Sequence, residues 1–336
     1  MNTLKDGELV RVITISDPGV AQAVFGPLHR HLAHIQEAFR DPSAPRGAPA
    51  YRVTLDAQGD QLTVRARPDG AADLERVQRI IDALADLGRR KARVREGEVL
   101  AAISFSEGPR ETPGPMTLPQ VGGLVLRTPR QVHYVEALRD ENIDLIFGVG
   151  PAGTGKTFLA VAAAVEALKQ ERYDKIIVTR PAVEAGEKLG YLPGDLAEKV
   201  DPYLQPIWDA FRSQMSENDL KARRERRQIE VAPLAFMRGR TLTNAFVIVD
   251  EAQNATILQM KMMLTRLGEG SRMVVTGDPT QIDLPRADQS GLAHAVAILE
   301  DLDAVEIIRF VTQDVVRHRL VARIIDAYDR SESGRG

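Results

Sequence analysis

The first hundred residues alternate between short β-rich runs and longer amphipathic segments. Three runs rich in β-branched residues predict strands, at residues 9–15, 51–55 and 61–65. Residues 20–39 predict a helix that is interrupted near Gly26-Pro27. A second helix is expected to begin at Asp73, as its N-cap, and to end near Leu87, with apolar side chains on one face. This pattern predicts a small α+β domain over residues 1–106.

The rest of the chain has the spacing of an α/β domain. Five short apolar runs recur between helical or loop segments, at residues 145–149, 175–179, 245–249, 272–276 and 305–308. They predict a parallel sheet with helices on both faces, within a domain of residues 124–336. Residues 107–123 are rich in proline and glycine and lack apolar periodicity, so we expect a linker there.

Composition narrows the class of protein. With 336 residues, 43% of them hydrophobic, the chain can bury a sizeable core in two domains. The absence of cysteine excludes disulfides and thiolate metal sites, and the six histidines lack metal-ligand spacing. No stretch has the length of a membrane span, and the N-terminus lacks a secretory pattern, so we expect a cytoplasmic protein. The net charge of −3 means that any nucleic-acid surface must be a local patch.

One stretch fits the phosphate-binding pattern G-x-x-x-x-G-K-[ST] at every specified position. Its residues are Gly150, Pro151, Ala152, Gly153, Thr154, Gly155, Lys156 and Thr157. A predicted strand precedes it and an alanine-rich helical segment follows, which is the context that the motif requires. Glycines allow backbone N–H groups to surround an anion, and the helix dipole favours negative charge at the same place. We therefore expect ATP there, with Lys156 on the β- and γ-phosphates and the Thr157 hydroxyl on Mg²⁺.

An acidic pair follows the predicted strand at 245–249. Asp250 is placed to hold Mg²⁺, and Glu251 to activate the water that attacks the γ-phosphate. An acidic pair after a strand can also simply favour a helix N-terminus, but the phosphate loop makes hydrolysis the better interpretation. On the neighbouring strand Gln281 is expected to sense the γ-phosphate, while Asp278 is either part of the site or a structural turn residue.

Two basic segments leave alternatives open. Residues 89–95 and 221–227 could follow a nucleic-acid backbone or form solvated faces. The element order of the N-terminal domain resembles a KH-type RNA-binding module, but the G-x-x-G loop is absent and residues 26–29 are only the nearest stretch, so an adaptor domain is the alternative. Tyr203, Trp208 and Phe211 could stack on bases, although their helical spacing favours a core position.

Several motifs together resemble the PhoH-like ATPases, whose core is similar to that of superfamily 1 helicases. They occupy residues 128–131, 150–157, 179–194, 231–242, 249–254, 276–285 and 314–318. The resemblance runs from about residue 122 to 328. It implies the fold class α/β, a P-loop NTPase parallel sheet with helices on both faces, preceded by a small α+β (KH-like) domain.

The resemblance also implies a function. It implies a cytoplasmic ATPase of RNA metabolism that uses ATP and Mg²⁺ in ribosomal RNA maturation, beside a separate endoribonuclease partner. Gln131 would contact adenine, and Arg317 would supply an arginine finger, acting on a neighbouring subunit of a homo-oligomer. Pairing of Arg317 with Asp314 across a helical turn is the structural alternative. A nucleotide-gated assembly switch or adaptor, which docks the endoribonuclease without remodelling RNA, is the alternative function.

Overall fold

The computed structural model describes residues 2–3, 8–41, 43, 51–91, 93–107, 116–181, 196–286 and 289–316, with the backbone alone at 2–3 and 196–203. The chain divides into two compact units. The first comprises residues 1–120 with 125–129, and the second comprises residues 121–124 with 130–336. A short hairpin of β5 (Gln120–Val121) and β6 (Leu124–Val125) lies at the boundary. The middle of the expected linker, residues 108–115, lies outside the described residues.

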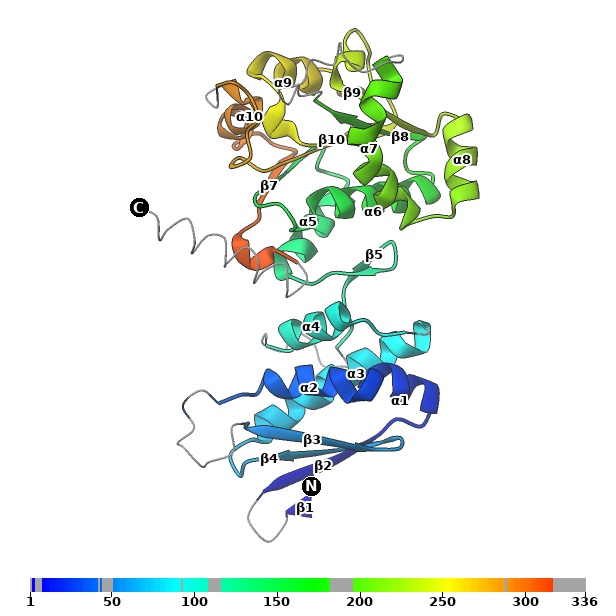
Figure 1. Cartoon of the computed structure of the whole chain (residues 1–336). Coiled ribbons are helices and arrows are strands. Elements are labelled where there is room, and N and C mark those ends of the chain that lie inside the picture. The colour runs from blue at the N-terminus through cyan, green and yellow to red at the C-terminus, as the bar shows by residue number, and fades with distance from the viewer. Residues whose placement is uncertain are drawn as a thin grey trace. The chain divides into compact units, whose positions relative to one another are not determined.

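The first unit is an antiparallel sheet with its helices on one face (Figure 1). The strand order is β1-β2-β4-β3. The strands are β1 (Asn2–Thr3), β2 (Leu9–Thr14), β3 (Val53–Gln58) and β4 (Gln61–Ala66). The helices are α1 (Pro18–Phe25), the 3₁₀ turn η1 (Pro27–His29), α2 (Arg30–Glu37), α3 (Ala71–Arg90) and α4 (Glu96–Phe105). The predicted hairpin and the interrupted helix are confirmed, whereas α4 was not predicted.

Apolar and polar side chains alternate along β4, and this alternation decides which face of the sheet packs in the core. Leu62 and Val64 are fully buried, while Arg65 between Val64 and Ala66 is exposed. The buried stripe of α3 packs over that face through the apolar positions that the periodicity predicts. The prediction that Asp73 is the N-cap of this helix is wrong, because α3 begins at Ala71 with Gly70 as its N-cap. Asp73 lies in the first turn, where its carboxylate still favours the helix dipole.

The second unit is built on a six-stranded sheet in which every strand pair is parallel. The strand order is β12-β7-β11-β10-β8-β9. The strands are β7 (Leu145–Val149), β8 (Lys175–Arg180), β9 (Ile229–Pro233), β10 (Ala245–Val249), β11 (Arg272–Gly277) and β12 (Val305–Arg309). All five predicted strands are present. The sequence did not predict β9, an edge strand that ends in a proline, where the missing N–H is tolerated.

Helices cover both faces of this sheet, as the apolar strands require. On one face α6 (Lys156–Lys169) packs against the strands and against α7 (Leu196–Arg212). On the other face α9 (Ile257–Leu264) and α10 (Gly291–Leu299) share a core with alternate strand residues (Figure 1). The remaining elements are α5 (Pro129–Arg139), α8 (Glu217–Glu225), η3 (Leu234–Met237), η4 (Ala252–Asn254) and η6 (Thr312–Asp314). The architecture is the predicted α/β fold of a P-loop NTPase.

A buried arginine fixes α5 to the sheet. Arg272, at the start of β11, donates to the carbonyl oxygens of Leu138 and Asp140, and its Nε lies 2.9 Å from the carbonyl oxygen of Ile143. Carbonyls at a helix C-terminus have no partner within the helix, and a cation there also favours the helix dipole. Arg272 therefore holds the end of the helix that carries Gln131.

None of the helices in the described ranges combines the length and the apolar composition that a bilayer crossing requires.

We predict that trypsin cuts the native chain first after Arg110. The sequence around it is rich in proline and glycine, and residues of this kind between domains are preferred sites of proteolysis. Leu118, in contrast, is buried in the core of the first unit, so the chain next to Leu118 is not expected to be cut first. Mass spectrometry should show a stable fragment that begins at residue 111, and the variant R110Q should resist this cut. A first cut within residues 145–275 would contradict the predicted domain division.

Candidate nucleotide-binding site

The phosphate loop joins the end of β7 to the start of α6. Gly150 has φ 139°, and a Cβ there would collide with the carbonyl oxygen of Phe310. Gly155 is the N-cap of α6 with φ 87°, a left-handed conformation that favours glycine. Buried β7 therefore delivers the chain into a tight loop at the carboxyl edge of the sheet, where ligands bind in open α/β folds.

Lys156 lies across the loop that precedes it. Its side chain is almost completely buried, and Nζ donates to the carbonyl oxygens of Gly150 at 2.7 Å and Pro151 at 2.8 Å. Burial lowers the pKa of the Lys156 ammonium. Nearby carboxylates oppose that shift, namely those of Asp278, Glu251 and Asp250. The cation is thus held on the loop by backbone oxygens, at the place where phosphate oxygens would take over as partners.

Asp250 follows β10 and connects three parts of the second unit. Its Oδ1 accepts from the Thr157 hydroxyl at 2.5 Å and from the Thr276 hydroxyl at 2.8 Å. Thr157 belongs to α6 and Thr276 to β11, which lies between β7 and β10 in the sheet. The carboxylate is almost completely buried, and these two donors offset its loss of hydration.

Glu251 is fixed by two side chains from different elements. Its Oε1 lies 3.1 Å from the guanidinium of Arg180, at the end of β8, and its Oε2 accepts from Nε2 of Gln253 at 2.6 Å. The backbone of Glu251 is left-handed, with φ 50°, which is uncommon for a residue with a side chain and is one of the strained conformations that active sites can hold. The conformation turns the chain sharply after Asp250.

Asp278 supports the phosphate loop from β11. Its Oδ2 accepts from the backbone N–H of Ala152 at 3.0 Å, and its Oδ1 accepts from the N–H and hydroxyl of Thr280 at 2.9 and 2.7 Å. Of the two roles left open by the sequence, the contact with Thr280 is that of a turn residue and the contact with Ala152 ties the turn to the loop. Asp278 therefore sets the position of the loop as well as the shape of its own turn.

Gln131 and Tyr134 lie behind the loop on α5. The buried amide of Gln131 donates from Nε2 to the carbonyl oxygen of Thr154 at 2.9 Å. Tyr134 is fully buried against Gly148 and packs edge-on to Phe310 at 5.4 Å. Burial, with a smaller contribution from Asp250, raises the pKa of the Tyr134 hydroxyl far above its usual range, so the ring stays neutral. The contact that we observe for Gln131 is with the loop, and its contact with adenine remains a prediction.

The chain that leads to Arg317 returns to the loop. The backbone N–H of Val316 donates to the carbonyl oxygen of Gly153 at 2.9 Å. Asp314 pairs with Arg130 at 3.1 Å and accepts from the N–H of Val311 at 2.9 Å. Arg317 itself, and the helix expected to follow Asp314, lie outside the described residues, as do residues 182–195.

The residues at this edge suit Mg²⁺ bound together with a nucleotide. A hydroxyl and a carboxylate converge in Thr157 and Asp250, both oxygen donors of the kind that Mg²⁺ selects. Within the described residues there is no group of three or more acidic or histidine side chains able to hold a metal alone. Mg²⁺ in such sites usually takes its other ligands from water and phosphates, so a set of two protein ligands fits.

The structure brings most of the predicted site residues together, and it adds others. The loop, Asp250 and Glu251 converge at one edge. Gln281 has an exposed side chain, and its backbone N–H bonds to Asp278. Gln253, which the sequence analysis did not single out, is buried and links Glu251 to the N–H of Asp278 through its amide. Its position in the run Asp250-Glu-Ala-Gln253 was the available signal, because a polar residue beside two functional acids is seldom without a partner.

The second basic segment lies on α8 and the residues after it. Arg224 stacks over the ring of Trp208 at 4.3 Å, while the side chains of Lys221, Arg226 and Arg227 are exposed. Trp208 and Phe211 are buried, as their helical spacing predicted. The side chain of Tyr203 is outside the described residues. Stacking of Trp208 on a base would require it to leave the core, so only the cations of this segment are available to a ligand.

We predict that Gln253→Ala destabilises the second unit by about 1–3 kcal/mol, because it leaves the buried N–H of Asp278 without its acceptor. The matched control Gln281→Ala removes an exposed side chain and should change stability by less than about 0.5 kcal/mol. Urea unfolding followed by Trp208 fluorescence measures this directly, since the single tryptophan reports on the second unit alone. Equal losses in both variants would show that Gln253 does not have the linking role.

Comparison with known proteins identifies the family. The model of the PhoH-like protein family matches residues 124–329. A PhoH-like protein of Mycobacterium tuberculosis is 48% identical over 297 residues, which cover 86% of this chain and 84% of that protein. A PhoH-like protein of Bacillus subtilis is 58% identical over 205 residues, 61% of this chain and 64% of that one. Protein PhoH of Escherichia coli K12 is 41% identical over 298 residues, 82% and 84% of the two chains.

Among solved structures, the SWI2/SNF2 ATPase core of Sulfolobus solfataricus in complex with dsDNA aligns with 55% of this chain and 44% of its own, at 16% identity and a TM-score of 0.33, a likeness too low to support any conclusion. The sequence matches agree with the motifs and with the site that the structure assembles from them. This chain belongs to the PhoH-like protein family.

Proposed function

We propose that this chain binds ATP with Mg²⁺ at the carboxyl edge of the second sheet and hydrolyses it. The convergence of Lys156, Thr157 and Asp250, with Glu251 beside them, is the observation that supports this proposal most strongly. A phosphate loop alone supports binding. An acidic pair at the end of a strand two places away in the sheet supports hydrolysis as well, because one carboxylate serves the metal and the other the attacking water.

Each residue has a distinct role in this proposal. Lys156 exchanges the carbonyl oxygens of Gly150 and Pro151 for phosphate oxygens, which favour the charged ammonium in its buried position. Thr157 and Asp250 hold Mg²⁺, which when bound neutralises charge on the phosphates. Glu251 orients and deprotonates water, while Arg180 and Gln253 hold the Glu251 carboxylate in place. Gln281, in the turn after β11, senses the γ-phosphate. Gln131 contacts adenine, by resemblance to the family.

We also propose that hydrolysis serves RNA metabolism in the cytoplasm, in ribosomal RNA maturation beside a separate endoribonuclease. The family resemblance supports this part, and the exposed cations Lys221, Arg226 and Arg227 offer a surface for phosphates. The alternative is a nucleotide-gated switch that docks the partner without remodelling RNA. ATP turnover with and without single-stranded RNA separates the two, because only an RNA remodeller should accelerate when RNA is added.

We predict that Glu251→Gln slows ATP hydrolysis by about 10²–10⁴-fold, because the attacking water loses its base. The variant should still bind Mg-ATP, because Asp250 and Thr157 are unchanged. Lys156→Ala should lose both ATP affinity and hydrolysis. Glu225→Gln makes the same replacement of a carboxylate by an amide at an exposed residue of α8, and it should behave like the wild type. Isothermal titration with Mg-ATP and a phosphate-release assay measure the two effects separately. Wild-type turnover in Glu251→Gln would assign the base to another residue.

We predict that Arg317 acts on ATP held by a neighbouring subunit of a homo-oligomer. An arginine finger contributes about 10³–10⁵ in rate. The alternative is a pairing with Asp314, whose Oδ2 already binds Arg130 and the N–H of Val311. The hydrogen bond from Val316 to Gly153 brings the end of the described chain to the phosphate loop of its own subunit, so action of Arg317 within its own subunit is the second alternative.

Mixing two inactive variants distinguishes action of Arg317 on a neighbouring subunit from action within its own subunit. Lys156→Ala subunits keep the finger, and Arg317→Ala subunits keep the nucleotide site, so a mixture should recover up to about a quarter of the wild-type rate if subunits assemble at random. Subunit exchange is verified by native mass spectrometry. Absence of activity in mixtures that do exchange would show that Arg317 works within its own subunit or not at all.

A further inference from the structure

Phe158 is a large apolar residue at the surface of the phosphate-binding helix. Between Leu159 and Leu168 every side chain of α6 except that of Glu166 is buried, whereas Phe158 is 38% exposed. Phe158 follows Thr157 directly, so it lies in the first turn of the helix, about 5 Å from the N-cap along the axis. An aromatic side chain is thus exposed beside the phosphate loop.

The start of α6 has N–H donors without a side-chain acceptor. Its N-cap is Gly155, which offers no side-chain oxygen to the N–H groups of the first turn. Lys156 adds a cation at the same place. These groups suit phosphate oxygens, so the triphosphate of the proposed ligand is held at this end of the helix. The ribose and the base are joined to the α-phosphate, and they must therefore lie close to the first turn.

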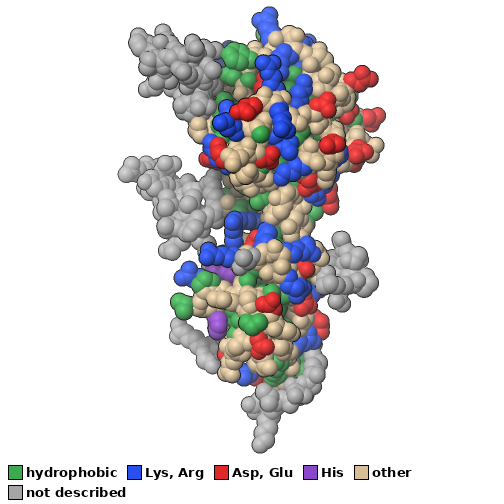
Figure 2. Space-filling model, turned by 90° about the vertical axis from the view of Figure 1, so that its right-hand side faces the viewer, with side chains coloured by type: hydrophobic (Ala, Val, Ile, Leu, Met, Phe, Trp, Pro, Cys, Tyr) green, Lys and Arg blue, Asp and Glu red, His purple; other side chains and the backbone are tan. Residues whose placement is uncertain are grey.

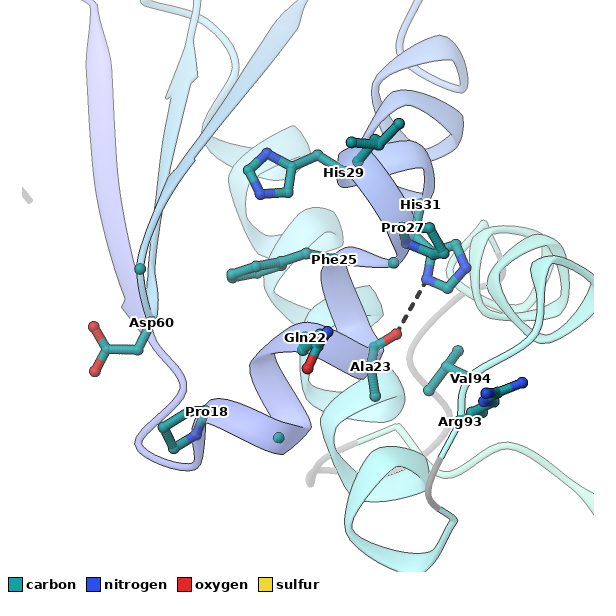
Figure 3. A pocket seen from close by; sticks show the side chains of 14 residues that line it. Pro18, Gln22, Ala23, Phe25, Pro27, His29, His31, Asp60, Arg93 and Val94 are labelled. Atoms are coloured by element: carbon teal, nitrogen blue, oxygen red, sulfur yellow. Dashed lines mark hydrogen bonds between the residues drawn. The ribbon is translucent and has the colours of Figure 1, made fainter.

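A groove in the first unit lacks this combination. Its volume of about 1220 Å³ is large enough for a nucleotide (Figure 3). At the start of α1, however, the Asp17 carboxylate already accepts from the N–H groups of Gly19 and Val20. The ring of His31 is likewise bonded to the carbonyl oxygen of Ala23. Volume alone therefore does not identify a nucleotide site, whereas the uncapped start of α6 does.

The side of α6 that carries Phe158 faces α5 and the β5–β6 hairpin. Phe158, Ala162 and Glu166 are spaced four residues apart, and side chains at this spacing lie on one side of a helix. A Cβ on Gly122 of the hairpin would lie 3.6 Å from the Cβ of Ala162. Glu166 accepts from the N–H of Gly122 at 3.1 Å and pairs with Arg139 of α5 at 2.9 Å. Phe158 is the member of this side that lies nearest the phosphate loop.

Gln131 lies at the same end of α5. Its amide nitrogen donates to the carbonyl oxygen of Thr154 and lies 3.4 Å from the position that a Cβ on Gly155 would take. α5 thus runs beside α6 in the same direction, with Gln131 at the loop end and Arg139 about two turns further on. The Gln131 amide and the Phe158 ring therefore lie at the same end of this helix pair.

We propose that the Phe158 ring stacks on the adenine base of the bound nucleotide. This inference rests on the proposed binding of ATP and adds the residue that holds the base. An aromatic ring contacts the face of a base and leaves the edge of the base for hydrogen bonds, which an amide such as that of Gln131 can make. Phe158 thus holds the face of the base, and the affinity for ATP exceeds the affinity for the phosphates alone.

The position of Phe158 favours a base over a protein partner. A partner on the ring would cover the first turn of α6, and with it the N–H groups that the phosphates need. A single ring is also far smaller than the surface that a stable protein interface buries. On the face of the second unit shown in Figure 2, hydrophobic side chains lie in small patches among charged ones. One ring is sufficient, in contrast, to stack on one base.

The test compares a ligand that has a base with one that has none, in the full chain. The probes are Mg-ATP and magnesium tripolyphosphate, which presents phosphates alone. Phe158→Leu removes the ring but keeps an apolar residue that favours a helix, and Phe158→Tyr keeps the ring. Phe236→Leu is the matched control, because it makes the same change at a phenylalanine of η3 that is 47% exposed.

Isothermal titration should show that Phe158→Leu binds Mg-ATP about tenfold or more weakly, because the stacking on the base is lost. It should bind tripolyphosphate like the wild type, because Lys156 and Thr157 are unchanged. Phe158→Tyr and Phe236→Leu should bind both probes like the wild type. In turnover assays Phe158→Leu should raise KM and leave kcat nearly unchanged, since the base is held equally in the ground state and the transition state.

Two outcomes would overturn the stacking role. They are wild-type affinity of Phe158→Leu for Mg-ATP, or equal losses of affinity for ATP and tripolyphosphate, which would show a disturbed phosphate loop. A changed subunit number in native mass spectrometry, with unchanged ATP affinity, would assign the ring to a subunit contact instead. A wild-type chain that binds neither probe would refute the proposed nucleotide site and this inference with it. ATP binding without turnover would refute the proposed hydrolysis and leave the stacking role standing.

Discussion

The buried carboxylate of Asp250 depends on the hydroxyls of Thr157 and Thr276, and the nucleotide site depends on that arrangement. A charged oxygen in the interior is tolerated only when hydrogen bonds replace its hydration, and loss of one donor costs about 1–3 kcal/mol or more. The pairing ties α6, β10 and β11 at one point, although these elements are distant in sequence. Because β11 lies between β10 and the phosphate-loop strand, Thr276 reaches Asp250 from the strand between the two sides.

The same rule applies to the other functional groups of the site. Lys156 is bound by loop carbonyls, Glu251 by Arg180 and Gln253, and the N–H of Ala152 by Asp278. A nucleotide must therefore replace existing hydrogen bonds of Lys156 rather than fill a set of unpaired groups. Such an exchange keeps the net free energy of binding well below the sum of the new contacts. It also makes the position of the loop sensitive to which partner Lys156 has.

Sequence reasoning predicted the parallel sheet, the phosphate loop and the acidic pair, because each has a local signature. Period, length and flanking glycines identify a buried strand and its loop without knowledge of neighbours. It missed β9, whose register is set by pairing with β8, and it missed Gln253, whose role depends on a contact with Asp278 that only the fold creates. Asp73 was taken for a cap because its side chain suits one, whereas the cap is Gly70 and the helix begins at Ala71. The sequence pattern of a helix predicts its extent but does not reveal which of the residues near its start is the N-cap.

The two units present turns of opposite physical character. In the phosphate loop the positive φ angles fall on glycines, which adopt them without strain, so the loop can change shape when the partner of Lys156 changes. In the turn after α1 two such angles fall on Leu28 and His29, which adopt them at a cost in free energy. The hydrogen bonds from Nδ1 of His31 to the carbonyl oxygens of Ala23 and Val24 hold the turn in this conformation. The loop that holds Lys156 owes its shape to glycines, whereas the turn after α1 owes its shape to the packing of His31.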